Sequence, residues 1–163
     1  MTGIFYGSTT GNTQALAQKI AERLGIGPEH LHDVGSASIE QTTPYDTLLL
    51  GSSTWGVGDL QDDWYSFIDT LKATDLSGKK IGLFGCGDSA SYPDSFGDAI
   101  GLLHEALSDS GCRFIGLVPA TDYPLHDSKA FQGSSVLGLL ADDDAPEKTA
   151  SRLETWVAAL QNT

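Results

Sequence analysis

Short apolar runs with the character of β-strands alternate with segments of helical periodicity from one end of the chain to the other. The strand-like runs are Ile4–Tyr6, Leu31–Val34, Thr47–Gly51, Lys80–Gly85 and Arg113–Val118. Strands and helices that alternate at this spacing form right-handed βαβ units around a parallel sheet covered on both faces. We therefore expect one α/β domain over residues 1–163, with five parallel strands between two layers of helices.

The segments between these runs place apolar residues three or four positions apart, as amphipathic helices do. The first such segment covers Asn12–Leu24 and ends at Gly25, a residue type that commonly terminates helices. Two tryptophans, Trp64 and Trp156, fall on the apolar faces of later helical segments. We therefore expect both of these indoles in the core.

The chain is strongly acidic, with 9 Lys and Arg against 22 Asp and Glu and a formal net charge of −13. Nucleic acids and anionic membranes require a cationic face, so we expect neither as a partner. No apolar run approaches the ~18 residues of a transmembrane span, and Met1–Ile4 shows no basic region or cleavage signal. We expect a cytoplasmic monomer. The two cysteines cannot form a zinc site alone, and the histidines lack metal-ligand spacing, so no metal is expected.

One segment departs from the regular alternation of strands and helices. Pro119–Ser135 is polar and irregular, and the apolar run Val136–Leu140 follows it. A loop of this length is usually functional or an insertion into a regular fold. We expect this insertion to split the fifth strand, with the chain leaving the edge of the sheet and returning to it.

A hydroxyl-rich loop, Gly7–Thr13, lies between the first strand and the first helix. Its hydroxyls, the Asn12 carboxamide and the free N–H groups at a helix N-terminus suit a phosphate group. It is not a Walker A loop, because Asn12 stands where that motif requires Lys, and it lacks the three spaced glycines of the dinucleotide fingerprint. A loop of this composition is also a good helix cap, so phosphate binding and capping remain alternatives.

Two further loops, Thr54–Leu60 and Gly85–Pro93, follow the third and fourth strands and each contain an aromatic residue. Trp55 stands between small residues and off any helical face, which favours a platform for a planar ligand over a place in the core. Pro93 favours extended geometry at Tyr92, so we expect no helix to begin there and do not interpret the glycines before it as a dinucleotide motif. Tyr92 is thus a second aromatic beside backbone donors.

Together these three loops resemble those of the long-chain flavodoxins, small electron carriers that hold FMN without a covalent bond. Ser8–Thr13 is similar to the phosphate loop of that family, and Ser53–Gly58 and Cys86–Tyr92 are similar to its two flavin loops. The resemblance extends over nearly the whole chain, including an insertion after the fifth strand. It implies a flavodoxin-like three-layer sandwich with strand order 2-1-3-4-5, an order for which flavodoxin is itself the usual example.

The resemblance also implies how the cofactor is held. Trp55 and Tyr92 would sandwich the isoalloxazine ring, and the backbones of Gly56, Gly58 and Gly87 would line its edge. The expected cofactor-binding residues are Ser8, Thr9, Thr10, Gly11, Asn12, Thr13, Thr54, Trp55, Gly56, Val57, Gly58, Cys86, Gly87, Asp88, Tyr92 and Asp144.

Asp88 would contact the pyrimidine end of the ring, and Asp144 would lie near the ribityl chain. We interpret Cys86 as a small residue at the end of its strand and not as a redox thiol. No side chain is arranged for acid–base or nucleophilic catalysis, so the reactive group would be the cofactor itself.

The expected function is therefore that of a low-potential one-electron carrier that uses FMN to shuttle electrons between larger redox enzymes. One alternative on the same fold is an FMN-dependent NAD(P)H:quinone oxidoreductase, which needs space over the flavin where the two aromatics are expected. A second alternative is a phosphoacceptor receiver module. That module needs an acidic cluster at the end of the first strand, where this chain has Gly7 and Ser8.

Acidic residues gather in the sequence around the two expected flavin loops. Neither Thr54–Leu71 nor Asp88–Gly111 contains a Lys or Arg, and together they hold Asp59, Asp62, Asp63, Asp69, Asp88, Asp94, Asp98, Glu105 and Asp109. A carboxylate ~10 Å away opposes added negative charge by ~0.4 kcal/mol in water. The acids are expected to lower the reduction potential and to attract redox partners with basic docking faces.

Overall fold

A central parallel sheet has five strand positions, in the order 2-1-3-4-5 of their appearance along the chain. The first four are β1 (Thr2–Gly7), β2 (Leu31–Asp33), β3 (Thr47–Trp55) and β5 (Lys80–Gly87), and the fifth is shared by β6 (Arg113–Ile115) and β10 (Gly138–Asp142). Every strand in this list pairs in parallel with the strand or strands beside it in the sheet. The expected strand order and the α/β fold class are therefore confirmed.

The structure is a computed structural model. It describes residues 1–8, 11–55, 59–90, 95–123, 128–143 and 145–161, with the backbone alone at Trp55, Asp59 and Asp122.

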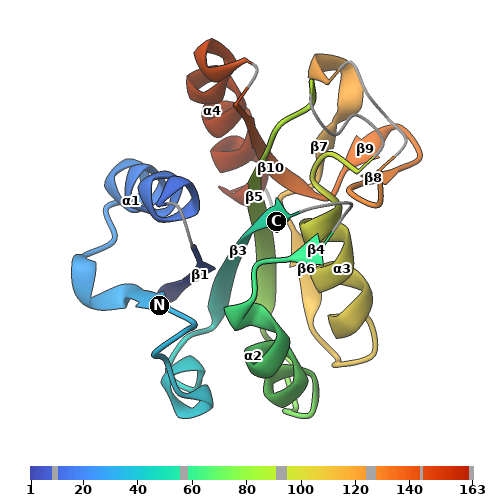
Figure 1. Cartoon of the computed structure of the whole chain (residues 1–163). Helices are drawn as coiled ribbons and strands as arrows, with labels where there is room; N and C mark the ends of the chain where they lie inside the picture. The colour runs from blue at the N-terminus through green and yellow to red at the C-terminus, as the bar shows by residue number, and fades with distance from the viewer. Residues whose placement is uncertain (9–10, 56–58, 91–94, 124–127, 144, 162–163) are drawn as a thin grey trace.

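Two layers of helices cover the sheet (Figure 1). On one face lie α1 (Asn12–Leu24) and α4 (Thr149–Gln161), and on the other lie α2 (Asp63–Lys72) and α3 (Asp98–Leu107). The range of α1 is the expected one, and Gly25 ends it with a left-handed φ of 69°. Short 3-10 turns cover Pro28–His30, Ile39–Thr42, Ala120–Asp122 and Pro146–Lys148. No helix in the described part of the chain is long and apolar enough to span a bilayer.

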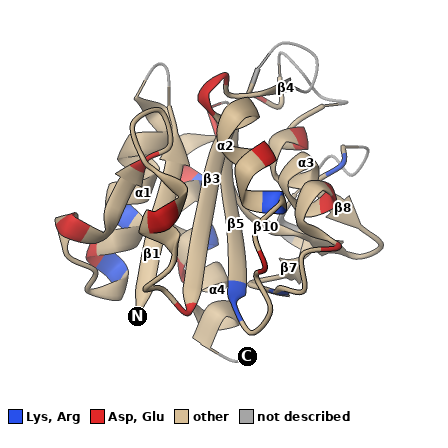
Figure 2. Cartoon of the chain, turned by 90° about the horizontal axis from the view of Figure 1, so that it is seen from below, with Lys and Arg blue, Asp and Glu red and all other residues tan. Residues whose placement is uncertain are grey.

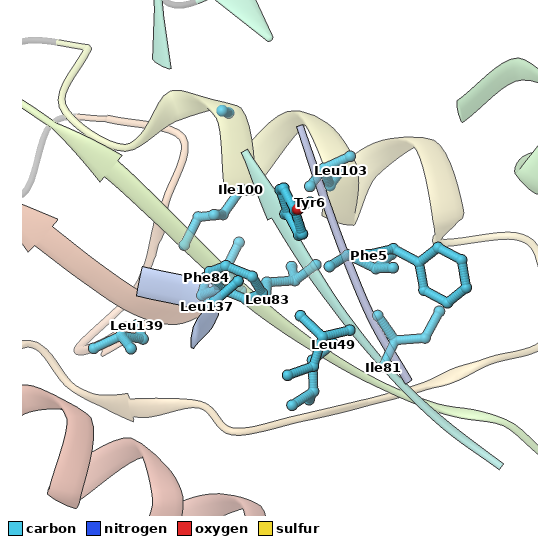
Figure 3. Close-up of a cluster of buried hydrophobic side chains, with 14 of the residues drawn as sticks. Phe5, Tyr6, Leu49, Ile81, Leu83, Phe84, Ile100, Leu103, Leu137 and Leu139 are labelled. Atoms are coloured by element: carbon cyan, nitrogen blue, oxygen red, sulfur yellow. The ribbon is translucent and has the colours of Figure 1, made fainter. Parts of the chain in front are cut away.

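The hydrophobic core lies between the sheet and the two helical layers (Figure 3). Phe5 of β1 and Phe84 of β5 are fully buried in it, and burying a side chain of this size contributes about 1.5–3 kcal/mol. Trp64 and Trp156 are also fully buried, as expected. The indole N–H of Trp64 donates to the Gly51 carbonyl at 2.7 Å, so its polar atom is satisfied inside the core.

The fifth strand position is divided between two segments. β6 pairs with Lys80–Gly82 of β5, and β10 pairs with the remainder, from Leu83 to Gly87. Between β6 and β10 the chain leaves the sheet and forms a small antiparallel sheet from β7 (Val118–Pro119), β9 (Ser135–Val136) and β8 (Phe131–Gln132). The expectation that the chain leaves the edge of the sheet and returns to it is confirmed.

The first half of this divided strand is shorter than expected. The sequence pattern extends it to Val118, whereas β6 ends at Ile115 and Val118 pairs with Val136 in the small sheet. The physical reason is Gly116, whose φ of 77° turns the chain out of the sheet. A Cβ at this position would lie 2.6 Å from the indole nitrogen of Trp156, so the turn packs directly on α4.

Candidate functional site

The carboxyl ends of four neighbouring strands meet at one edge of the sheet. Gly7 of β1 pairs with Ser52 of β3, β3 stays paired with β5 as far as Cys86, and Gly87 of β5 pairs with Asp142 of β10. The loops that follow β1, β3 and β5 therefore leave the sheet side by side. In open α/β sheets, ligands bind beyond this edge.

The N-terminus of α1 is open at this edge. Its N-cap residue, Gly11, has a φ of 93°, and its N–H donates to Ser8 Oγ at 3.0 Å. No described side chain caps the helix, and its first turn holds no acidic residue, whereas α2 and α3 begin on Asp63 and Asp98. The free N–H groups and the helix dipole give this end a positive partial charge, which fits a phosphate. Thr9 and Thr10 lie outside the described residues.

Thr13, in the first turn of α1, carries a buried hydroxyl with no hydrogen-bond partner among the described groups. The residue is 1% exposed, and an unpaired buried hydroxyl costs about 1–3 kcal/mol. A ligand oxygen bound at the helix start would satisfy this hydroxyl. Together with the uncapped N–H groups of α1, it is the observation in the structure that points most directly to an anionic ligand.

Cys86, at the start of the third loop, lies beside Thr13. Burial raises the pKa of the Cys86 thiol to about 12. The Thr13 hydroxyl lies near enough to favour the thiolate and offsets this rise in part, but it makes no hydrogen bond to the neutral thiol. The thiol is therefore protonated at neutral pH and is a poor nucleophile. This agrees with our interpretation of Cys86 as a small strand-end residue, and it shows that the first and third loops approach each other.

The second loop begins with a reversal of the chain. Trp55 pairs with Asp59 of the antiparallel strand β4 (Asp59–Leu60), so the chain turns back between these two residues. Gly56, Val57 and Gly58 lie outside the described residues, as does the Trp55 side chain. Stacking of Trp55 on a planar ligand therefore stays a prediction.

The Thr54 hydroxyl is bonded to helix α3. Its Oγ1 accepts a hydrogen bond from the backbone N–H of Ala99 at 3.1 Å, across 45 residues of sequence. Ala99 is in the first turn of α3, where backbone N–H groups have no partner within the helix. Thr54 thus connects the second loop to the helix that follows the third loop, a role that its sequence neighbours do not indicate.

Two carboxylates hold the described part of the third loop. Asp88 Oδ1 accepts the backbone N–H of Ala90 at 3.0 Å, within the loop itself. Asp142, from the end of β10, accepts both the backbone N–H of Ser89 at 3.0 Å and the Ser89 hydroxyl. Tyr92 lies outside the described residues, so its contact with a flavin also stays a prediction.

Asp142 and the adjacent Asp143 are site residues that the sequence reasoning missed. Partial burial, and then the carboxylates of Asp88 and Asp142, raise the pKa of Asp143, so three carboxylates gather at this edge of the sheet. A signal was present, because the acidic run Asp142–Asp144 directly follows an apolar strand-like run. Asp144, the acid that was expected there, lies outside the described residues.

The acidic residues are distributed differently from the sequence expectation. Figure 2 shows acidic segments near β4 and the start of α2, and basic ones at the opposite end of β5. Asp62 and Asp63 are exposed at the start of α2, whereas Asp98 is only 8% exposed and accepts the backbone N–H of Lys129 at 2.7 Å. Asp109 follows the far end of α3, because a helix between parallel strands returns to the opposite edge. Those of the nine acids that the structure describes therefore do not form one cluster.

Comparisons with known proteins agree with this architecture. The family model described as Flavodoxin matches residues 4–156. The flavodoxin of Synechocystis sp. is 38% identical over 161 residues, covering 98% of this chain and 95% of that protein. Flavodoxin 1 of Escherichia coli K12 is 41% identical over 159 residues, covering 96% of this chain and 90% of that protein.

Solved structures show the same fold. The flavodoxin of Fusobacterium nucleatum bound to flavin mononucleotide has a TM-score of 0.90 at 23% identity, over 99% of this chain and 96% of that chain. Oxidised flavodoxin 1 from Bacillus cereus has a TM-score of 0.68 at 29% identity, over 98% of each chain. Since the family model runs from the first strand into the last helix and the relatives align over nearly their full length, the chain belongs to the flavodoxin family.

Proposed function

We propose that this chain carries single electrons at low potential between larger redox enzymes, with FMN held non-covalently at the carboxyl edge of the sheet. Membership in the flavodoxin family makes it an FMN-based electron-transfer protein and not an enzyme. The flavin supplies the redox chemistry, and the protein supplies binding, orientation and electrostatics. The observation that carries the site assignment is the N-terminus of α1, which no described side chain caps, with the Thr13 hydroxyl, which has no partner among the described residues.

The phosphate of FMN is proposed to bind at the start of α1. The hydroxyls of Ser8, Thr9, Thr10 and Thr13 and the N–H groups of the first turn are the donors, and no Lys or Arg lies within this loop. Such a site depends on neutral donors and the helix dipole. The absence of acidic side chains in the first turn supports this assignment, because a carboxylate there would repel the phosphate.

The ring of FMN is proposed to lie between the second and third loops, with Trp55 and Tyr92 on its two faces. Gly56, Gly58 and Gly87 would present backbone groups to its edge. The register of the sheet supports this placement, because β3 and β5 stay paired up to the residues that precede both loops.

The proposed partners are redox proteins with basic docking faces. Asp62 and Asp63 are exposed at the start of α2, beside the half-exposed ring of Tyr65, and charges of this kind steer a cationic partner during encounter. We further propose that residues 1–163 act as one monomeric FMN-binding domain of the long-chain type, with its insertion around 119–135. The proposed compartment is the cytoplasm, which suits the free thiols of Cys86 and Cys112.

The sharpest test of the phosphate site is Thr13→Val, which removes the hydroxyl and keeps the shape of the side chain. The flavin-free variant should be at least as stable as the wild type, because the substitution removes a buried polar atom that has no partner in the described part of the chain. Its affinity for FMN should fall about tenfold, the loss expected for one hydrogen bond to a charged group. Its affinity for riboflavin, which has no phosphate, should not change.

Thr155→Val is the matched control, because that hydroxyl donates to the Ser151 carbonyl on α4, away from the proposed site. It should change neither flavin affinity. Equal affinities of the wild type for FMN and riboflavin would contradict the phosphate assignment. Steady-state NAD(P)H oxidation by the purified protein without a reductase would instead favour a quinone oxidoreductase.

A further inference from the structure

Asp142 is a buried acid that lies at the end of the edge strand β10. It pairs with Gly87 of β5 in the parallel ladder, and it is 4% exposed. The next residue continues the contact, since the Asp143 N–H donates to the Gly87 carbonyl at 2.8 Å. The Asp142 carboxylate is therefore held rigidly beside the point where the third loop leaves β5.

Both oxygens of this carboxylate accept hydrogen bonds from one residue of the loop. Asp142 Oδ1 accepts the backbone N–H of Ser89 at 3.0 Å, and Oδ2 accepts the Ser89 hydroxyl. A buried carboxylate is costly unless such donors compensate it, and bonds to an ionised acceptor are stronger than neutral ones. The pair is therefore a fixed two-point attachment and not an incidental surface contact.

This attachment connects the loop to a distant part of the chain. The neighbouring bond, from Ala90 N–H to Asp88 Oδ1, lies within the loop, whereas Ser89 and Asp142 are 53 residues apart in sequence. A bond within the loop shapes the turn, but only a bond to the sheet fixes where the turn lies. Ser89 also stands three residues before Tyr92, the aromatic proposed to cover one face of the flavin.

We infer that Asp142 is a positioning residue for the cofactor. By holding Ser89 at two points, it fixes the position of Cys86–Ala90, the described part of the third loop, beside which the flavin ring is proposed to bind. This inference rests on the proposed function, because it assumes that the ring binds at this loop. It assigns the carboxylate a geometric role that is separate from the effect of its charge on the flavin.

Three substitutions separate geometry from charge. Ser89→Ala removes one attachment and leaves every charge in place, and Asp142→Ala removes both attachments. Asp142→Asn removes the charge but keeps both bonds, because the amide oxygen can accept the Ser89 N–H and the amide NH₂ can donate to the Ser89 hydroxyl. The control is Ser108→Ala, whose hydroxyl donates to the His104 carbonyl at the far end of α3.

The measurements are the dissociation constants of FMN and riboflavin for each reconstituted variant, with the visible circular dichroism of the bound flavin. Ser89→Ala should raise the dissociation constants of FMN and riboflavin by the same factor, about fivefold. Asp142→Ala should raise both by about tenfold or more, since a hydrogen bond to a charged group contributes about a factor of ten in affinity. The ratio of the two constants should not move, because the phosphate site is untouched. Asp142→Asn and Ser108→Ala should stay within about twofold of the wild type.

The outcomes distinguish this inference from the proposed function. If the wild type does not take up FMN, the proposed function is wrong. If the wild type binds FMN and Ser89→Ala binds it equally well, the positioning role alone is wrong. The positioning role is also wrong if Asp142→Asn lowers the affinity for FMN as much as Asp142→Ala does, because the loss of charge would then account for the effect. Ser89→Ala decides the matter even if Asp142→Ala does not fold, because Ser89 is only partly buried.

Discussion

The Tyr123 hydroxyl accepts a hydrogen bond from the backbone N–H of Leu140 at 3.2 Å. Because Tyr123 lies in the insertion and Leu140 in β10, this bond connects the insertion to the edge strand. The guanidinium carbon of Arg152 lies 3.9 Å from the centre of the Tyr123 ring, and Arg152 Nη1 donates to the Leu140 carbonyl at 3.3 Å. Tyr123 and Arg152 are both 4% exposed. An edge strand presents unpaired backbone groups, and these two side chains satisfy them at Leu140.

Tyr123→Phe should therefore destabilise the protein. It removes the acceptor of a buried N–H while keeping the ring under Arg152, and an unsatisfied buried donor costs about 1–3 kcal/mol. The free energy of unfolding from urea titration measures this loss. Tyr65→Phe is the control, because that ring is 47% exposed on α2, and it should stay within about 0.5 kcal/mol of the wild type. Equal stabilities of the two variants would show that the Leu140 bond contributes nothing.

Thr54→Val should destabilise the protein by about 1 kcal/mol, a typical loss when a helix cap is removed. The reason is that Ala99 N–H in the first turn of α3 loses its acceptor. Thr54→Ser keeps the hydroxyl and should restore most of the stability, as thermal unfolding of the two variants would measure. A valine variant as stable as the wild type would mean that the hydrogen bond from Ala99 to Thr54 contributes nothing.

His104 should make the protein less stable as the pH falls below neutrality. Burial lowers the pKa of His104 from 6.5, and its ring stacks on Phe114 with centroids 4.1 Å apart. The unfolded chain therefore takes up a proton near pH 6.5 before the folded protein does, so stability is full above that pH and falls below it.

Urea titrations between pH 7.5 and 5.5 check this sign. His104→Gln should flatten the decline relative to the wild type. Burial, and then the nearby His30, also lowers the pKa of His32. Some loss of stability at low pH should therefore remain in the His104→Gln variant. Parallel curves for the variant and the wild type would exclude His104 as a contributor.

Asp62→Asn should slow reduction by a partner with a basic face. Asp62 is exposed just before α2 at the carboxyl edge of the sheet, and one charge at ~10 Å is worth ~0.4 kcal/mol in water, or about a twofold change in rate. Stopped-flow reduction at low salt measures it, and added salt should remove the difference. Asp109→Asn makes the same charge change beyond the far end of α3. If both variants slow the reaction equally, net charge and not a local docking surface controls encounter.

Much of this fold follows from local patterns in the sequence. The apolar period of three to four residues and the glycine after it define α1 from Asn12 to Leu24, because helix formation depends on neighbours within one or two turns. The same reasoning places Trp64 and Trp156 in the core. The hydroxyl-rich loop after β1 was recognisable for a similar reason, since its residue types and its place before a helix are both local features.

Tertiary structure alone decided the contacts between residues that are far apart in the chain. Ser89 meets Asp142 because β5 and β10 pair in one register, and Thr54 caps α3 because that helix packs across the end of β3. Asp98 and Asp62 are both acids beside an expected flavin loop, yet one is buried against Lys129 and the other is exposed. Residue type and spacing determine which element forms, whereas the packing of elements against one another determines which polar groups find partners, and that depends on the whole fold.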